Sequence, residues 1–460
     1  MKRIFQCLAT GWLLMACSAS PEPGLPTDSD ILQRIAVPEF PDVSYDIRDF
    51  GARADGEIDS RPAINEAISQ CSVRGGGRVV VPAGQYVCKG PIIMKSRVNL
   101  HLEEGAEILF SPDPHDYLPA VLTIWEGTEL FNYSPLVYAY QVSDIAITGR
   151  GRLNGQASQG FARFRPQRSE MQDSLRQMGI DQVPVRERCF GERSILPPSM
   201  IQPFGCRNIL IEGVTILDSP YWVIHPVFCD NVTVRGVTIS SHNLNNDGCD
   251  PEYTTNVLIE RCVFDVGDDA VAIKAGRDQD AWRIGQPTRN ILIRDCEFKS
   301  KCNGLCIGSE MSAGVENVRM ERVRISRCLS GIYFKSNLDR GGFIRNVHVS
   351  DVVCDTVRTA FIRFETNYHG ARGGFHPTVF ENFRIERVRG TSSSECGFYA
   401  VGTPGHNLKQ ITLEDVGLRS APTPYVLKHT ENVSFHKVRI NGTLMPEQPA
   451  QTESSTLKSY

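Results

Sequence analysis

The chain has 460 residues, which exceeds the usual length of a domain with one compact core. We therefore expect either several domains or one elongated repeat fold. The net charge is −4 and the basic residues are scattered, which excludes the electrostatic footprint of a nucleic-acid-binding protein and leaves a neutral or acidic substrate open.

The N-terminus has the features of an export signal. Lys2 and Arg3 precede an apolar run over residues 4–16, which is too short to span a bilayer. The run ends in Leu-Met-Ala-Cys, which resembles a bacterial lipobox and implies cleavage after residues 1–16 and lipidation of the Cys17 thiol. The alternative is an ordinary signal peptide with an incidental cysteine. We expect an exported outer-membrane lipoprotein, periplasmic or at the cell surface, that contacts the membrane only through this anchor.

The rest of the chain divides by composition. Residues 17–41 are rich in Ser, Pro, Asp and Glu and lack apolar periodicity, so we expect a flexible tether. One domain is expected over residues 42–445, followed by a polar tail at 446–460. Within the domain, residues 156–198 form a polar, Arg-rich insertion. We expect it to wall off one end of a groove, and the alternative is a surface loop without a role.

Most of the chain after Ile201 repeats one pattern. It reads "NILIEGVTI" from Asn208 and recurs every 22 to 36 residues or so, with variable loops between constant cores. Such spacing is typical of stacked coils. The later units begin at Asn231, Asn256, Asn290, Asn317, Asn346, Asn382, Gln410 and Asn432.

Each unit predicts short strands. Counted from the first residue as zero, positions +1, +3, +6 and +8 are apolar with polar residues between, as in two alternating strands joined by a bend. Several units add a third strand with apolar positions +15 and +17, for example Val271 and Ile273. Three strands per turn predict an all-β fold, a single-stranded right-handed parallel β-helix.

The chain contains 15 cysteines, but their positions argue against a disulfide framework. Cys262 and Cys296 both occupy position +6, where other units have Val. We therefore expect them to be buried small hydrophobic residues on neighbouring coils rather than disulfide partners or metal ligands.

Paired carboxylates interrupt this pattern in "VFDVGDDAVAIK". Asp268 and Asp269 fall in the bend before a third strand, and position +13 of the next coil is Asn303, about 4.8 Å away if the coils stack regularly. The preceding coil places Asp247 and Asp250 near the same corner. The alternative is that these aspartates are solvated turn residues without a catalytic role. Repulsion among carboxylates on neighbouring coils has a use, however, because it holds one carboxyl protonated beside ionised partners.

At these residues the sequence resembles the polygalacturonase family of pectin-degrading glycoside hydrolases, which have a pectin-lyase-like solenoid. The family's Asn-Thr-Asp motif is similar to residues 245–247, its Asp-Asp pair to residues 268–269, and the Lys of its Arg-x-Lys motif to Lys335. Further similarity runs through "WEGTELFNYSP", "SPYWVIHPV", "GRDQDAWR" and "IGSEMSAG". The segment "DFGARADGEIDSRPAINEAI" is similar to the family's first coil and its short N-terminal capping helix.

The resemblance implies an inverting hydrolase of galacturonosidic linkages in polygalacturonan or rhamnogalacturonan, exo-acting if the insertion closes the groove. Asp269 would be the general acid, and Asp247 with Asp268 would position and deprotonate the water. Lys335 would bind a substrate carboxylate. An inverting enzyme needs carboxyl groups about 6.5 to 9.5 Å apart, which neighbouring coils can supply. No cofactor and no metal are implied. We expect a monomer whose only partner is a pectic oligo- or polysaccharide.

Two departures from the family pattern concern substrate binding. The stretch around Asn303 lacks the family's Gly-His-Gly histidine, and Tyr333 replaces the Arg of Arg-x-Lys, so rhamnogalacturonan fits about as well as polygalacturonan. His225, next to Trp222, is expected to line the groove floor, with packing as its alternative role. Together with Lys335, we expect the substrate-binding residues to be Asn303, Tyr333, His225 and Arg277.

Two alternatives from other functional classes remain. Clustered aspartates on a β-helix can hold Ca2+, as in a calcium-dependent pectate lyase, which would need Lys274 or Arg277 as its base. A noncatalytic pectin-binding surface lipoprotein would explain the missing His and Arg. Retention of three aspartates beside an anionic sugar argues against simple binding.

Overall fold

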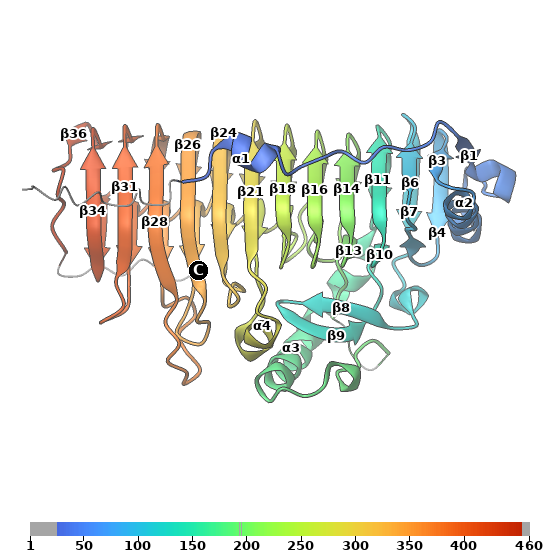
Figure 1. Cartoon of the computed structure of the whole chain (residues 1–460), viewed down its shortest axis with the longest axis horizontal. Coiled ribbons are helices and arrows are strands. Elements are labelled where there is room, and N and C mark those ends of the chain that lie inside the picture. Colours follow the sequence, from blue (N-terminus) through green and yellow to red (C-terminus); the bar gives the residue numbers. More distant parts are fainter. Residues whose placement is uncertain (1–24, 193, 195, 453–460) are drawn as a thin grey trace, which may run out of the picture.

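The computed structural model describes residues 25–192, 194 and 196–452, and these form a right-handed parallel β-helix (Figure 1). The expected signal peptide and Cys17 lie outside the described residues. No helix among the residues described has both the length and the apolar character needed to cross a membrane. The predicted fold class is confirmed.

Most coils contribute one strand to each of three parallel sheets. The first sheet runs through strands β1 (Ser44–Asp46), β3 (Gly77–Val81), β6 (Val98–Leu102), β11 (Ser143–Gly149), β14 (Arg207–Glu212), β16 (Asp230–Arg235), β18 (Thr255–Glu260), β21 (Thr288–Arg294), the first parts of β24 (Val315–Cys328) and β26 (Phe343–Val357), β28 (Val379–Glu386), β31 (Leu408–Glu414) and β34 (Thr430–His436).

The second sheet follows the bend of each coil. It comprises β2 (Asp55–Asp59), β4 (Gly84–Cys88), β7 (Ala106–Phe110), β12 (Arg152–Asn154), β15 (Thr215–Leu217), β17 (Thr238–Ser241), β19 (Val263–Val266), β22 (Glu297–Ser300), the last parts of β24 and β26, β29 (Arg389–Ser393), β32 (Gly417–Leu418) and β35 (Arg439–Ile440), which pairs antiparallel with β36 (Thr443–Leu444).

The third sheet carries the functional face. It begins with β5 (Ile92–Ile93), β10 (Val137–Tyr140) and β13 (Ile201–Phe204), continues through single bridges at Ile224 and Cys249, and ends with β20 (Val271–Ile273), β23 (Asn303–Ile307), β25 (Ser330–Lys335), β27 (Ala360–Glu365), β30 (Cys396–Val401) and β33 (Thr423–Lys428).

The repeated Asn explains why the coils bend where they do. All nine residues at position zero have φ between 54° and 62°, a left-handed conformation that Asn tolerates better than most residues. Five of them donate their side-chain amide to the Asn one coil earlier, at 2.8 to 3.1 Å. The bend and the stacking therefore depend on the same side chain.

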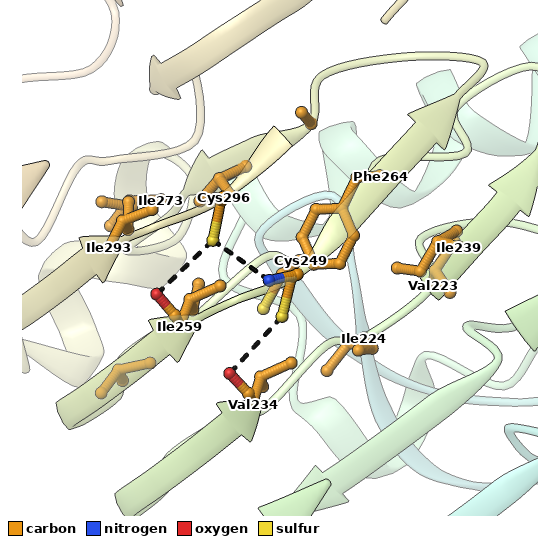
Figure 2. Packing of buried hydrophobic residues seen from close by; sticks show 14 of the residues in the cluster. Val223, Ile224, Val234, Ile239, Cys249, Ile259, Phe264, Ile273, Ile293 and Cys296 are labelled. Carbon is orange, nitrogen blue, oxygen red and sulfur yellow. Dashed lines mark hydrogen bonds between the residues drawn. The ribbon is translucent and has the colours of Figure 1, made fainter. Parts of the chain in front are cut away.

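The interior is filled by the apolar positions of the repeat. Figure 2 shows Cys296 beside Phe264 and Ile293, with its thiol near the Ile259 carbonyl. Cys262 and Cys296 are free and almost fully buried, as predicted. Stacked apolar rows of this kind supply the hydrophobic stabilisation that no single coil has alone.

A helix closes the N-terminal end of the stack. In α2 (Arg61–Val73), Ile64 and Ile68 are completely buried against the first coils, and Pro62 stands in the first turn, where its missing N–H costs nothing (Figure 1). The expected capping helix is therefore confirmed.

The expectation of a flexible tether at residues 17–41 is wrong for its second half. Residues 28–32 form helix α1 (Asp28–Leu32), and the segment runs along the outside of the first sheet (Figure 1). Ile31 packs between the side chains of Leu258 and Leu292, which the repeat leaves as an apolar outer surface. Composition alone did not reveal this docking site. At the other end, residues 446–452 return to the last coils.

The remaining elements project from the third sheet. They are the hairpin of β8 (Val121–Trp125) and β9 (Thr128–Asn132), α3 (Arg165–Ile180) in the predicted insertion, and α4 (Asp278–Ile284) (Figure 1). Single turns of 3-10 helix occur at Ile47–Phe50, Pro114–Tyr117, Ala157–Gln159, Phe161–Phe164 and Val185–Glu187.

Candidate active site

A cleft of about 610 Å³, partly open to solvent, lies on the outer face of the third sheet. Its floor carries Asp247, Asp268 and Asp269. One wall comes from the β8–β9 hairpin and α3, and the opposite wall comes from the loop at residues 368–372, between β27 and β28. The cleft therefore brings the three predicted carboxylates together.

The register of the third sheet aligns the floor. Trp222, Asp247, Asp269 and Asn303 each stand two residues before a core residue of the same ladder. These four therefore occupy equivalent positions on consecutive coils and form one row, and Trp222, Asp247 and Asp269 of this row line the cleft. Asp268 extends from the bend beside this row.

Asp269 is held as a carboxylate. Its Oδ1 accepts hydrogen bonds from the backbone N–H of Asn303, at 2.9 Å, and from the Asn303 side-chain amide, while its Oδ2 lies 3.2 Å from Lys335 Nζ. Burial acts to raise the pKa of Asp269, but the charges of Lys335 and Lys274 and the Asn303 hydrogen bond outweigh it, and the pKa is lowered. A carboxylate with both oxygens accepting cannot readily donate a proton. This arrangement argues against the expected role of Asp269 as general acid.

Its neighbours have the opposite electrostatics. Burial and the charge of Asp269 raise the pKa of Asp268 to about 6. Burial and the charges of Asp250 and Asp268 raise the pKa of Asp247 well above its usual range. Asp247 Oδ1 has no hydrogen-bond partner, and its Oδ2 is 4.0 Å from Lys274. One ionised carboxylate beside carboxyls that retain protons is the pairing that acid–base catalysis requires.

Two of the five predicted substrate contacts line the cleft. These are Lys335, whose ammonium lies 4.9 Å from the ring centre of Tyr368, and Arg277, which binds Glu310. Both present a cation to the cleft, as recognition of a substrate carboxylate requires.

The other three predicted contacts are covered, and their assignment is corrected. Asn303 is buried, and its side-chain amide donates a hydrogen bond to Asp269. Tyr333 is buried with its hydroxyl donated to Glu365. His225 is 0% exposed and both its ring nitrogens have protein partners. Neighbouring side chains cover all three positions.

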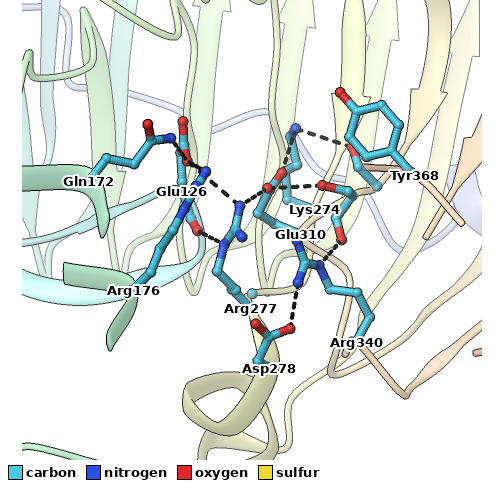
Figure 3. Close-up of polar contacts among 12 residues, drawn as sticks. Glu126, Gln172, Arg176, Lys274, Arg277, Asp278, Glu310, Arg340 and Tyr368 are labelled. Carbon is cyan, nitrogen blue, oxygen red and sulfur yellow. Dashed lines mark hydrogen bonds and ion pairs between the residues drawn. The ribbon is translucent and has the colours of Figure 1, made fainter. Parts of the chain in front are cut away.

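Four cleft residues were not predicted, namely Glu126, Gln172, Arg176 and Glu310. Figure 3 shows an alternating network in which Glu126 binds Arg176 and Gln172, Arg277 binds Glu310, and Glu310 also binds Lys274. Lys274 and Arg277 keep the pKa of Glu310 well below its usual value despite its burial. These residues come from the hairpin, the insertion and two loops, so only the folded chain assembles them. The remaining wall residues include Arg168, Arg340, Tyr368 and Arg372.

One group near the floor has the composition of a metal site. Asp268, Asp269 and Cys302 have potential ligand atoms within 4.8 Å of one another. Lys335 occupies Oδ2 of Asp269, and Ca2+ takes oxygen rather than thiol ligands. The group does not fit the calcium site of a lyase.

Comparison with known proteins identifies the family. Residues 189–438 match the family model of Glycosyl hydrolases family 28. The chain belongs to glycosyl hydrolase family 28. This member is therefore a hydrolase of O-glycosyl bonds, which sets aside the lyase and the noncatalytic alternatives. Residues 44–101 also match "Rhamnogalacturonase A/epimerase, pectate lyase-like".

Individual relatives agree with this assignment. A hyperthermoactive exopolygalacturonase from Thermotoga maritima superposes with a TM-score of 0.88 at 38% identity, over 91% of this chain and 96% of that one. A probable polygalacturonase of Vitis vinifera is 29% identical over 430 residues, 89% of this chain and 82% of that protein. An exo-poly-alpha-D-galacturonosidase of Dickeya chrysanthemi is 27% identical, over 67% of this chain and 54% of that protein.

Proposed function

We propose that the protein is an exo-acting hydrolase that releases galacturonate units from one end of α-linked galacturonan in pectin. The observation that carries the exo mode is the enclosure of the cleft. Helix α3 turns Arg168, Gln172 and Arg176 toward the cleft from one helical face, and Arg372 of the opposite loop lies 3.8 Å from Asp173 of α3. A cleft bridged in this way accepts a chain end more easily than the middle of a polymer.

The charges of the cleft support a uronate substrate. Lys274, Lys335, Arg277 and Arg340 surround the floor, and their carboxylate partners are mostly buried protein groups. Arg168 has only the Asn245 side-chain oxygen as a hydrogen-bond acceptor among the described residues. Free donor capacity at the wall favours a ligand that bears carboxylates. The names of the Thermotoga maritima and Dickeya chrysanthemi relatives agree with this substrate class.

We assign the proton transfers by the charge states of the carboxyl groups. Asp268 keeps its proton because Asp269 beside it is ionised, and Asp268 is the more exposed of the raised pair, so it donates to the glycosidic oxygen. Asp269 and Asp247 orient a water molecule, and Asp269 accepts its proton. The water attacks the anomeric carbon as the glycosidic bond breaks, in one displacement with inversion.

The setting of the enzyme is also a proposal. The N-terminal segment supports export and lipidation at Cys17, which would place the enzyme at the outer membrane, on its periplasmic or outer side. We propose that it acts as a monomer, because residues of a single chain are sufficient to form the floor and both walls of the cleft.

The test uses a galacturonate tetramer labelled at its reducing end. An exo enzyme releases monomer in the first turnovers, and proton NMR should show the β-anomer before mutarotation. Release of dimers first would contradict the exo mode, and an initial α-anomer would contradict single displacement. A rhamnogalacturonan oligomer tested in parallel decides between the two pectin backbones.

A further inference from the structure

We infer that the buried pair His225–Glu252 is a positioning pair that fixes the aromatic and cationic floor of the cleft for one uronate unit. The uronate identity rests on the proposed function. The pair itself does not reach the cleft, since both side chains are 0% exposed. It acts through Trp222, Lys274 and Arg277, which do line the cleft.

The hydrogen bonds of the pair define its protonation. Gln202 Nε2 donates to His225 Nδ1 at 2.9 Å, while Gln202 Oε1 is occupied by the Thr123 hydroxyl. His225 Nε2 therefore carries the proton and donates to Glu252 Oε2, also at 2.9 Å. Burial lowers the pKa of His225, although Glu252 opposes this, so the imidazole is neutral and its orientation is set at both nitrogens.

The first branch leads from His225 to the cleft floor. The Trp222 ring contacts His225 in an edge-to-face arrangement with ring centres 4.7 Å apart. On the Trp222 ring lies Lys274 Nζ, 4.7 Å from the ring centre. A fixed imidazole therefore fixes an indole, and the indole supports the ammonium group beside Asp247.

The second branch leads from Glu252. Its Oε1 accepts the backbone N–H of Gly276 at 3.0 Å, directly before Arg277. Gly276 has φ of 72°, and a Cβ there would lie 1.5 Å from the Tyr253 hydroxyl, so no side chain is tolerated at this position. Glu252 thus holds the start of the segment from which Arg277 reaches Glu310, as Figure 3 shows for the outer part of this network.

A third connection reaches the wall. Trp222 stacks on Tyr221 with ring centres 5.5 Å apart, and Tyr221 stacks on Trp125 of the hairpin at 5.1 Å. Arg168 of α3 lies over both Trp125 and Tyr221. The aromatic row therefore connects the insertion to the same buried pair.

Simple packing does not explain these residue types. The residue paired with Glu252 one coil earlier is Val227, so an apolar side chain fits this row. Burying a carboxylate and an imidazole costs free energy that a hydrophobic pair would avoid. The residues that carry this cost lie directly beneath the cleft floor, where a fixed side-chain geometry benefits substrate binding.

The test compares His225→Leu, His225→Gln and Glu252→Gln with the wild-type enzyme on galacturonate trimer. We expect His225→Leu to raise KM roughly tenfold or more with little change in kcat, because a misplaced floor weakens substrate binding. His225→Gln retains a donor for Glu252 and should restore most of the affinity. His242→Leu is the matched control, since His242 pairs with Asp265 at 2.8 Å on the surface, and its KM should not change.

A second measurement separates positioning from general stability. Wild-type proton NMR should show an exchange-protected imidazole N–H resonance that His225→Leu and Glu252→Gln both lose. An unchanged KM in folded His225→Leu, or a loss of kcat at unchanged KM, would overturn the inference. If His225→Leu does not fold, an unchanged KM in Glu252→Gln overturns it equally. Inactivity of the wild-type enzyme on galacturonate oligomers would contradict the proposed function instead, so the two failures can be told apart.

Discussion

Replacement of Lys335 by Met is the most informative perturbation of the cleft floor. The side chains of Lys335 and Asp269 are only 9% and 1% exposed, with Nζ and Oδ2 3.2 Å apart. Methionine keeps the length and the apolar stem of lysine but removes the charge. Asp269 would then remain buried beside Asp268 with Asn303 as its principal donor.

The expected cost in stability follows from this burial. Removing one partner of a buried ion pair costs about 3–5 kcal/mol, because the other charge is left uncompensated. Lys299→Met is the matched control: Lys299 contacts Asp265 at 2.7 Å, but its side chain is 56% exposed. An exposed pair of this kind contributes about 0–1 kcal/mol.

The sign of the pH dependence is set by Asp269. Its folded-state pKa is lowered, so the pair stabilises the fold above the unfolded pKa of about 3.9, and this contribution is lost as the pH falls through the folded pKa. The stability difference between wild type and Lys335→Met should therefore be largest near neutral pH and should shrink in acid. Urea unfolding at several pH values measures it.

Activity should change in the same direction. Without Lys335 the pKa of Asp269 rises, so the acidic limb of kcat/KM moves to higher pH and activity at a fixed acidic pH falls. Lys299→Met should keep the wild-type profile. An unmoved acidic limb together with a stability loss no larger than that of Lys299→Met would refute the assignment of Asp269 as the ionised group.

Three further outcomes are expected. Asp268→Asn should lower kcat at least 10²-fold while substrate binding persists, and the wild-type kcat/KM should fall as the pH rises through about 6, where Asp268 loses its proton; retention of activity by this variant would reject Asp268 as the acid. Asp173→Ala removes the exposed partner of Arg372 and should raise the share of dimer among the first products, whereas an unchanged monomer yield would show that this contact does not enclose the cleft. Cys17→Ala should move the protein from the membrane fraction to the soluble fraction in cell fractionation, and a variant that stays with the membrane would point to another anchor.

The repeat could be predicted from the sequence because it depends on interactions between residues close together in the chain. Alternating apolar residues determine which side chains enter the core, and Asn in the left-handed conformation recurs near the start of most first-sheet strands. Cys262 and Cys296 were correctly placed in the interior on this basis alone. The same counting put Asp247 and Asp269 near one corner of neighbouring coils, because register in a regular stack follows from sequence spacing.

The charge states of the carboxyl groups and the burial of candidate contact residues could not be predicted from sequence spacing. Asp268 and Asp269 are adjacent and chemically identical, yet the pKa of one is raised and that of the other is lowered, because Lys335 and Asn303 reach only Asp269. His225 has an outward strand position, but Trp222 of its own coil and Gln202 and Glu252 of neighbouring coils cover it.

The solenoid, the capping helix and the carboxylates on neighbouring coils can be predicted from the amino-acid order, since each depends on short-range periodicity. Which carboxyl holds the proton, which walls enclose the cleft and where the N-terminal segment docks follow from the folded chain. Those properties depend on residues far apart in the chain, such as Asp173 and Arg372, whose separation across the cleft is set by how loops of variable length fold onto the regular coils. Loop conformation carries no repeat, so its long-range contacts leave no pattern in the sequence.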